Sequence, residues 1–246
     1  MMLTEVNLLM LLCFFVVAFL YGSVGHGGAS GYLAIMALFS LDPSLMRSSA
    51  LILNLFVAGI AFVNFRLHFQ FRWKLFLPLI LGSIPLAYLG ATLNINPITY
   101  KVILGLVLLL AVARLIYRST KEYELRELPS TWLLALLGMA IGFLSGLIGI
   151  GGGILLSPLL IFFRWEKNKE TALYSSLFIL LNSISGLSGL GLKNIHLSYD
   201  FTYWILAAIL GGLLGSWSAS SVLPVKYFRL TLAVVLLIAC YKLILV

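Results

Sequence analysis

The chain has 246 residues, of which 62% are hydrophobic and only 10% are charged, and its formal net charge is +8. Soluble domains contain about 45–50% apolar and about 25% charged residues, so this composition argues against a soluble enzyme with a large polar cleft, a nucleic-acid-binding protein and a disordered chain. The apolar residues are spread along the whole chain, which predicts an all-α polytopic membrane protein.

Apolar segments close to the length needed to cross a bilayer, about 20 residues, recur along the chain in two similar series. We expect the first repeat, residues 1–117, to contain a helical hairpin and three helices, over residues 5–41, 44–65, 73–93 and 98–117. A polar linker covers residues 118–130. We expect the second repeat, residues 131–246, to contain a hairpin and three helices, over residues 131–163, 169–191, 201–222 and 226–245.

The two series resemble each other in sequence. The stretch FLYGSVGHGG from Phe19 matches FLSGLIGIGG from Phe143, 124 residues later, and Asn54 falls on Asn182 at a spacing of 128 residues. Many secondary transporters are built from duplicated units of this kind. The sequence therefore predicts an internal duplication.

The positive charges predict how the two repeats are oriented. If each hairpin returns to the side from which it entered, all but four of the 16 lysines and arginines lie on one side. Lys and Arg are concentrated in cytoplasmic loops, so we expect the second repeat to be inverted, the linker to be cytoplasmic and both termini to lie outside. The same charges also fit ten full crossings, so the depth of the hairpins stays open. This distribution explains the positive charge without a nucleic-acid partner.

Two glycine-rich stretches are the most distinctive local signals, residues 22–31 (GSVGHGGASG) and 146–153 (GLIGIGGG). Glycine at this density breaks a helix, and unwound backbone is tolerated at membrane depth only where it lines a cavity or is buried in protein. The helix after each break would present free N–H groups and its positive dipole end, which together suit an anion. The alternative is that the glycines only let helices pack closely. The glycines that we expect at the anion site are Gly25, Gly27, Gly28, Gly149, Gly151, Gly152 and Gly153.

Polar side chains near these stretches complete the predicted site. His26 is the one ionisable residue expected near the middle of the membrane, where it could neutralise an anion or carry a proton. Tyr21 precedes the first stretch and could line the path. Asn54 and Asn182 should either face the site or join helices to each other, because a buried amide needs partners. Serine hydroxyls could donate to an oxyanion or simply pack, and the candidates are Ser48, Ser49, Ser175 and Ser176.

The other polar residues argue against further chemistry. All eight carboxylates fall in predicted loops or at segment ends, Glu166 among them, which favours an anion because a buried carboxylate would repel one. Arg47, next to the outer end of its helix, could attract anions, but it is expected to extend to the lipid headgroups. The two cysteines and three histidines fit no metal pattern, and no nucleotide-binding motif is present. We therefore expect no metal, no cofactor and no enzymatic activity.

The paired stretches, each ending in GxGG, and halves of four hydrophobic segments resemble the TauE/SafE family of sulfite exporters. The resemblance covers nearly the whole chain. It implies transport of sulfite, sulfoacetate or a related organosulfur anion. The first stretch carries His26 where the second carries Ile150, so the two hairpins should be functionally unequal.

The sequence therefore predicts a secondary transporter, or permease, for a small anion in the inner cell membrane. The site would lie between the hairpin tips at the middle of the bilayer and would open to each side in turn. An anion channel is the main alternative, and a non-transporting membrane subunit is less favoured because the chain has no large loop or soluble domain. The sequence leaves open which anion is carried, in which direction, with which coupling ion, and whether the protein forms oligomers.

Overall fold

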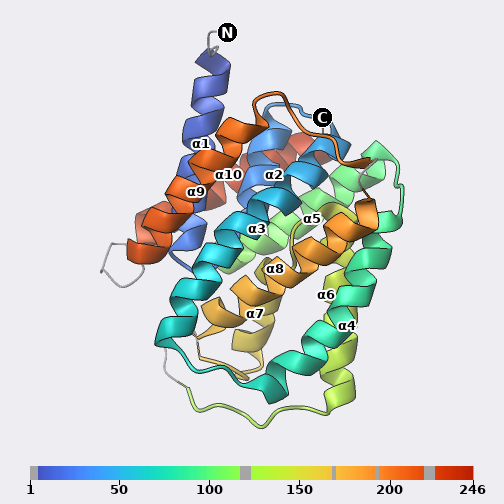
Figure 1. Cartoon of the computed structure of the whole chain (residues 1–246), viewed down its shortest axis with the longest axis vertical. Helices are drawn as coiled ribbons and strands as arrows, with labels where there is room; N and C mark the ends of the chain where they lie inside the picture. The colour runs from blue at the N-terminus through green and yellow to red at the C-terminus, as the bar shows by residue number, and fades with distance from the viewer. Residues whose placement is uncertain (1–4, 117–122, 168–169, 192–193, 219–224, 246) are drawn as a thin grey trace.

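The computed structural model describes residues 5–116, 123–167, 170–191, 194–218 and 225–245, and in this part of the chain the secondary structure is entirely helical (Figure 1). In chain order the helices are α1 (Glu5–Gly22), α2 (Ala29–Leu38), α3 (Pro43–His68), α4 (Trp73–Thr92), α5 (Pro97–Ile116), α6 (Thr131–Ile148), α7 (Gly153–Phe162), α8 (Thr171–Leu190), α9 (Phe201–Ser218) and α10 (Val225–Leu245). Five of them, α3, α4, α6, α8 and α9, are long and apolar enough to cross a membrane. The prediction of an all-helical polytopic membrane protein is confirmed.

The helices follow the expected segments closely. The main difference is at α3, which continues to His68 instead of ending near residue 65 because no glycine or proline interrupts it there. Residues 118–122 of the expected linker, and the end of the segment expected over 201–222, lie outside the described residues.

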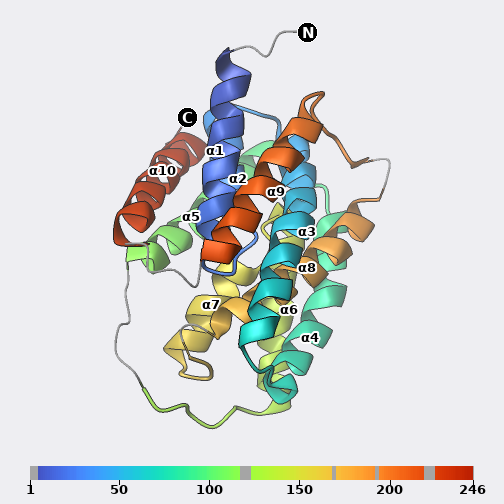
Figure 2. The ribbon, with the colours of Figure 1, turned by 60° about the vertical axis from the view of Figure 1, so that its left-hand side comes forward.

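Two helical hairpins enter the bundle from opposite ends. In Figures 1 and 2, α1 descends from the top and α2 returns upward, whereas α6 rises from the bottom and α7 returns downward. Helices α2 and α7 have ten residues each, which gives a length of about 15 Å, half the hydrocarbon thickness of about 30 Å. Helix length therefore favours re-entrant hairpins over full crossings.

The main helix pairs each join one half of the chain to the other, and they form a symmetric set. α1 packs against α9 and α4 against α6, while α3 packs against α8 and α5 against α10. Exchanging the two halves leaves this set of pairs unchanged. The beginning of α1 and the end of α10 lie toward the top of Figure 1, and residues 123–130 run along the bottom. The inverted duplication stays a prediction, and this arrangement supports it.

Glycines bring two of these helix pairs into backbone contact. Gly138, Gly142 and Gly146 occupy every fourth position of α6, and a Cβ at each would fall on a main-chain carbonyl oxygen of α4. Gly211 and Gly215 of α9 have the same relation to α1. Such spacing of small residues lets membrane helices approach closely. These glycines serve packing, and except for Gly146, which begins the second glycine-rich stretch, they lie outside the two stretches.

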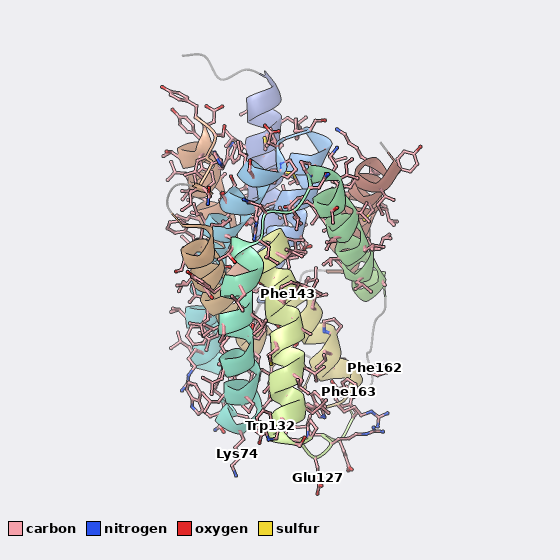
Figure 3. The ribbon with its side chains drawn as sticks, turned by 90° about the vertical axis from the view of Figure 1, so that its right-hand side faces the viewer. Lys74, Glu127, Trp132, Phe143, Phe162 and Phe163 are labelled. Carbon is pink, nitrogen blue, oxygen red and sulfur yellow. The ribbon has the colours of Figure 1, made fainter. Side chains whose placement is uncertain are left out.

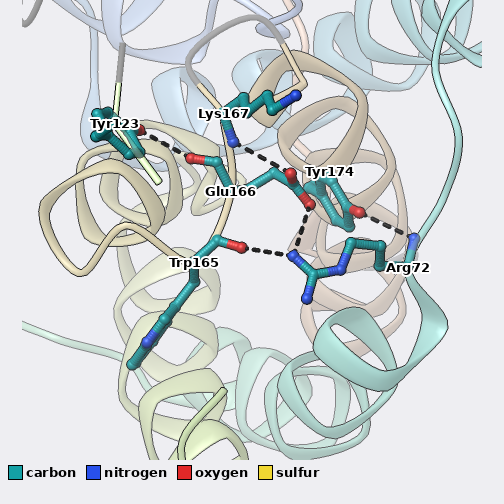
Figure 4. A network of polar contacts seen from close by, with 6 residues as sticks. All are labelled: Arg72, Tyr123, Trp165, Glu166, Lys167 and Tyr174. Atoms are coloured by element: carbon teal, nitrogen blue, oxygen red, sulfur yellow. Dashed lines mark hydrogen bonds and ion pairs between the residues drawn. The ribbon is translucent and has the colours of Figure 1, made fainter. Parts of the chain in front are cut away.

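A polar network joins three connecting segments at the end of the bundle that carries residues 123–130 (Figure 4). Glu166, in the α7–α8 connection, is fully buried and forms an ion pair of 3.8 Å with Arg72 at the start of α4. Arg72 also donates to the carbonyl of Trp165 at 2.9 Å, and the Tyr123 hydroxyl donates to the carbonyl of Glu166 at 2.9 Å. Glu166 thus lies in a connection, as expected, but inside the protein.

The same end presents exposed charged and aromatic side chains beside this network. Lys74, Glu127 and Trp132 project from it in Figure 3. Trp132 is 80% exposed, as suits an aromatic side chain at the interface between lipid and water.

The contact between α4 and α6 predicts the effect of adding one methyl group. In the variant Gly138→Ala, the new Cβ would fall on the main-chain carbonyl of Leu79, so the free energy of unfolding should fall by about 1–3 kcal/mol. The matched control is Gly59→Ala in α3, where the nearest atom to the new Cβ would be Leu180 Cδ1 at 3.9 Å. The control should be neutral or slightly stabilising. Denaturant unfolding in detergent micelles measures both variants, and equal stability of the two would contradict the backbone contact.

The charges beside α8 predict a pH-dependent stability. Burial, followed by the neighbouring Glu166, raises the pKa of Glu170 above its ordinary value of 4.5, against the opposing influence of Lys167 and Arg72. The folded protein therefore holds this proton more tightly than the unfolded chain. The resulting stabilisation is complete below pH 4.5 and is lost as the pH rises through the raised pKa.

At neutral pH, Glu170→Gln should therefore unfold at a slightly higher temperature than the wild type. The difference should shrink as the pH falls toward 4.5, because the wild-type carboxyl then becomes neutral as well. Glu127→Gln, at an exposed carboxylate of the same end, should leave the unfolding temperature unchanged. A lower unfolding temperature for Glu170→Gln at neutral pH would refute this explanation.

Candidate functional site

The tips of the two hairpins meet inside the bundle, beside Asn54 of α3 and Ile179 of α8. A Cβ at Gly27 in the first tip would contact both of these side chains. A Cβ at Gly151 in the second tip would lie 2.7 Å from Asn54 Nδ2 and 2.8 Å from Ile179 Cγ2. Both side chains are buried, and α3 packs against α8. The two breaks in the helices therefore converge on the same pair of side chains.

The backbone of each tip leaves the N–H groups of a helix start without side-chain caps. α2 and α7 begin after Gly28 and Gly152, whose φ angles of 90° and 78° are in the left-handed region that glycine adopts without strain. Neither helix start receives a hydrogen bond from a capping side chain. Because the first N–H groups of a helix have no acceptor within it, both tips present donors and a positive dipole end.

The remaining glycines of the predicted site pack at the flanks of the tips. A Cβ at Gly25 would meet the backbone of Ala172, and a Cβ at Gly149 would lie 3.0 Å from atoms of Arg47. A Cβ at Gly153 would meet Ile179. The first tip thus packs on the start of α8, and the second tip packs on the start of α3.

His26 connects the first tip to the second hairpin. Its side chain is 2% exposed, and its Nδ1 lies 2.9 Å from the carbonyl oxygen of Val24, to which it can donate. With that tautomer, Nε2 accepts from the Ser157 hydroxyl of α7 at 3.0 Å. Ser157 is also hydrogen-bonded to Ser175 of α8. A line of polar groups therefore runs from the first tip across α7 to α8.

Tyr21, near the end of α1, forms hydrogen bonds to the first tip and to the start of α2. Its carbonyl oxygen accepts a hydrogen bond from the His26 N–H at 2.8 Å. Its hydroxyl is 2.6 Å from the Ser30 hydroxyl at the start of α2. Tyr21 is therefore placed to hold the turn that presents His26.

The two equivalent asparagines have different surroundings. Asn182 accepts from the Ser83 hydroxyl of α4 and donates to the Phe178 carbonyl oxygen at 2.8 Å, so it joins α8 to α4. Asn54 donates to the Ser183 hydroxyl at 3.3 Å, and its Oδ1 has no hydrogen-bond donor among the described residues. Since Oδ1 is the atom that faces Gly27, Asn54 directs the unpaired oxygen of its amide, a hydrogen-bond acceptor, at the meeting point of the tips.

The four predicted serines also differ in their hydrogen-bond partners. Ser175 belongs to the line that begins at His26. Ser48 and Ser176 donate to carbonyl oxygens of their own helices at 2.9 Å, as serines often do when they pack inside a helix. Ser49 is fully buried, and its hydroxyl has no partner among the described residues.

The structure corrects the expectation for Arg47. Only 7% of its surface is exposed, so it does not extend to the headgroups. Its guanidinium donates to the carbonyl oxygens of Gly146 at 2.7 and 3.0 Å, Gly90 at 2.9 Å and Leu93 at 3.4 Å. These carbonyls lie at the C-terminal ends of α6 and α4, whose negative dipole ends attract a cation. The expectation is wrong because Arg47 finds acceptors inside the protein.

Sequence reasoning also missed Ser157 and Ser183, which contact His26 and Asn54. A signal existed for Ser157, because it is the one hydroxyl-bearing residue of the apolar helix that follows the second glycine stretch. Ser183 directly follows Asn182, so its position on the face toward α3 required knowledge of how α3 and α8 pack.

A groove on the outer surface lies away from the tips. It has a volume of about 640 Å³ and runs between α4 and α8, where Ile84, Tyr88 and Ile184 are among its lining residues. Its lining is mainly apolar and would not replace the water around an anion. The polar groups between the tips, by contrast, are buried.

Comparison with known proteins agrees with this architecture. The family model described as sulfite exporter TauE/SafE matches residues 10–243. A protein of Sinorhizobium fredii (strain NBRC 101917 / NGR234), described as "Probable membrane transporter protein y4hK", is 31% identical over 237 residues, which are 95% of this chain and 96% of the relative. No solved structure matches the chain. The resemblance drawn from the glycine-rich stretches is confirmed, and the chain belongs to the sulfite exporter TauE/SafE family of multi-pass membrane proteins.

Proposed function

We propose that the protein is a secondary transporter that carries a small sulfur-containing oxyanion, such as sulfite or sulfoacetate, through a site where the two hairpin tips meet. The observation that carries the proposal is the contact of both Gly27 and Gly151 with Asn54 and Ile179. Two helix starts, each with uncapped N–H groups, thereby face one position from opposite ends of the bundle. Helix starts of this kind bind anionic groups in transporters built from broken helices.

The charges around the tips support an anion as the solute. Among the described residues, Glu166 is the one fully buried carboxylate, and it lies at the end of the bundle beside residues 123–130. The tips themselves are flanked by His26, Ser157 and Asn54. Hydroxyl, amide and imidazole groups can donate hydrogen bonds to oxygen atoms without adding a negative charge. Their donors are engaged by Val24, His26 and Ser183 in the structure, so an anion would replace these bonds.

The packing of the helices supports a carrier that opens to each side in turn. Each hairpin contacts its partner helix through glycines that bring the backbones together, α1 on α9 and α6 on α4. Such pairs can move as units. Displacement of one hairpin would uncover the site from one side while the other tip still closes it. The direct contact of both tips with the same side chains favours this mechanism over a permanently open channel.

We place the protein in the inner cell membrane, with residues 123–130 on the cytoplasmic side and both termini outside. Lys74, Arg72 and Lys167 then lie at the cytoplasmic end, in agreement with the positive-inside rule. A membrane potential that is negative inside favours the exit of a monovalent anion by about 2.3 kcal/mol per 100 mV. We therefore propose export as the direction of transport.

Flux into proteoliposomes tests this function. Purified protein should give saturable uptake of sulfite or sulfoacetate that is accelerated by the same anion on the opposite side, and chloride should compete weakly. Asn54→Asp would place a negative charge between the tips, and at about 4 Å two like charges repel by about 4 kcal/mol at an effective dielectric constant of about 20. Uptake by this variant should fall by about a hundredfold or more.

The control for this variant is Asn64→Asp, the same change near the C-terminal end of the same helix, where Asn64 donates to the Ser216 carbonyl of α9 instead of facing the tips. Its uptake should stay within a few-fold of the wild type. Absence of flux for every sulfur-containing anion would reject the proposed substrate class. Single-channel currents without counter-transport would establish a channel instead of a carrier.

His26 predicts a pH dependence of the flux. Histidine changes its charge within the physiological pH range, and His26 is buried at the first tip with Ser157 as its partner. His26→Gln should therefore lower the rate of anion uptake and flatten its dependence on pH. His68→Gln, at an exposed histidine near the end of α3, should change neither. A His26→Gln variant with wild-type uptake at every pH would exclude a role for this side chain in transport.

A further inference from the structure

Arg47 is a buried cation in direct contact with the second hairpin tip. Its side chain is 7% exposed. A Cβ at Gly149 would lie 3.0 Å from both its Cγ and its carbonyl oxygen. The turn of α3 that carries Arg47 therefore packs against the glycines that precede α7, two helical turns before Asn54.

The hydrogen-bond partners of Arg47 are all uncharged. Its Nε and Nη2 donate to the Gly146 carbonyl, Nη2 also donates to Gly90, and Nη1 makes a longer bond of 3.4 Å to Leu93. Within the described ranges, no carboxylate forms an ion pair with it. Buried cations in membrane proteins are usually paired with an anion or placed at a functional site. The C-terminal ends of α4 and α6 each contribute about half an elementary charge, so they offset the charge of Arg47 only while both ends stay in contact with it.

The two tips differ in that only the first carries a basic side chain, and Arg47 lies beside the tip that lacks one. The first tip carries His26, which is linked through Ser157 to Ser175 on the facing helix α8. The second tip carries Ile150 in place of His26, and Arg47 on the facing helix α3 precedes Ser175 by 128 residues. Each tip thus has one basic side chain beside it. At the first tip it is His26, which belongs to the tip itself, and at the second tip it is Arg47, which belongs to the facing helix α3.

We propose that Arg47 is the fixed countercharge of the transported oxyanion and forms an anion-binding position beside Gly149. The proposal rests on the proposed function. The bonds to Gly90 and Leu93 connect Arg47 to the end of α4, and the bonds from Nε and Nη2 to the Gly146 carbonyl connect it to α6 of the second hairpin. When the α4–α6 pair moves as a unit away from α3, the guanidinium of Arg47 can exchange the carbonyls of Gly90, Leu93 and Gly146 for the oxygens of the anion. A planar fork of donors suits an anion with two or more oxygens.

Binding of two anions to three variants tests this role. Sulfite can accept two parallel hydrogen bonds, whereas chloride can accept only from a point, so the pair separates charge from geometry. Arg47→Gln should weaken the binding of both anions roughly tenfold or more, because it removes the charge. Arg47→Lys keeps the charge but loses the fork, so it should bind chloride like the wild type and sulfite several-fold more weakly. Titration calorimetry of the protein in detergent micelles measures both dissociation constants.

The matched control is Lys242→Gln. Lys242 also donates to the end of a helix, at 2.6 Å to the Leu38 carbonyl of α2 and 2.7 Å to the Ser40 hydroxyl, but it does not contact a hairpin tip. This variant should bind both anions like the wild type. If it weakens binding as much as Arg47→Gln does, the effect is general electrostatics and the proposal fails.

Two further results would overturn the proposal. One is wild-type binding of both anions by Arg47→Gln. The other is equal weakening of sulfite and chloride by Arg47→Lys together with a lower unfolding temperature, which would show that Arg47 only holds α4 and α6 in place. If Arg47→Gln fails to fold, the ratio of sulfite to chloride affinity in Arg47→Lys decides alone. Failure of the wild type to bind any anion would instead reject the proposed function.

Discussion

The structure depends on the need to satisfy backbone N–H groups where two helices are broken inside an apolar helical bundle. An unpaired polar group in hydrocarbon costs several kcal/mol, so neither tip can face lipid. Bringing both tips to Asn54 and Ile179 surrounds the breaks with protein. The same convergence leaves the starts of α2 and α7 without side-chain caps at one position, which is where the proposed function places the anion.

The helix pairs in glycine-mediated contact attach the two hairpins to the rest of the bundle. A re-entrant hairpin buries less surface than a pair of full crossings, so each needs a strong attachment to the rest of the bundle. Gly142 and Gly146 on α6 and Gly215 on α9 provide it by letting main chains touch, since close van der Waals contact is a main source of helix association in lipid. The attachment is rigid along each pair, so any opening of the site must occur between pairs, where α3 and α8 carry the polar residues.

Much of this fold could be predicted from sequence because hydrophobic length and glycine density are local properties. The side-chain partners could not be predicted in the same way. Arg47 is buried because it finds carbonyls 43, 46 and 99 residues away along the chain, and a single-sequence reading sees only its place near the start of a helix. Asn54 and Asn182 are equivalent in sequence, but Ser83 on α4 engages only Asn182. Such differences arise from packing between the two halves.

The divergence of the two halves bears on how tightly an anion could be held. A transporter must bind its solute well enough to load it and weakly enough to release it, as a channel must. Two fixed cations at the tips would favour loading and oppose release. Here the second tip adjoins one permanent cation whose charge is offset by the ends of α4 and α6 while both contact it. The first tip adjoins a histidine, which can be neutral. A duplicated site with one fixed and one variable charge can therefore change its attraction for an anion within a single transport cycle, whereas two identical halves would have to change both charges together.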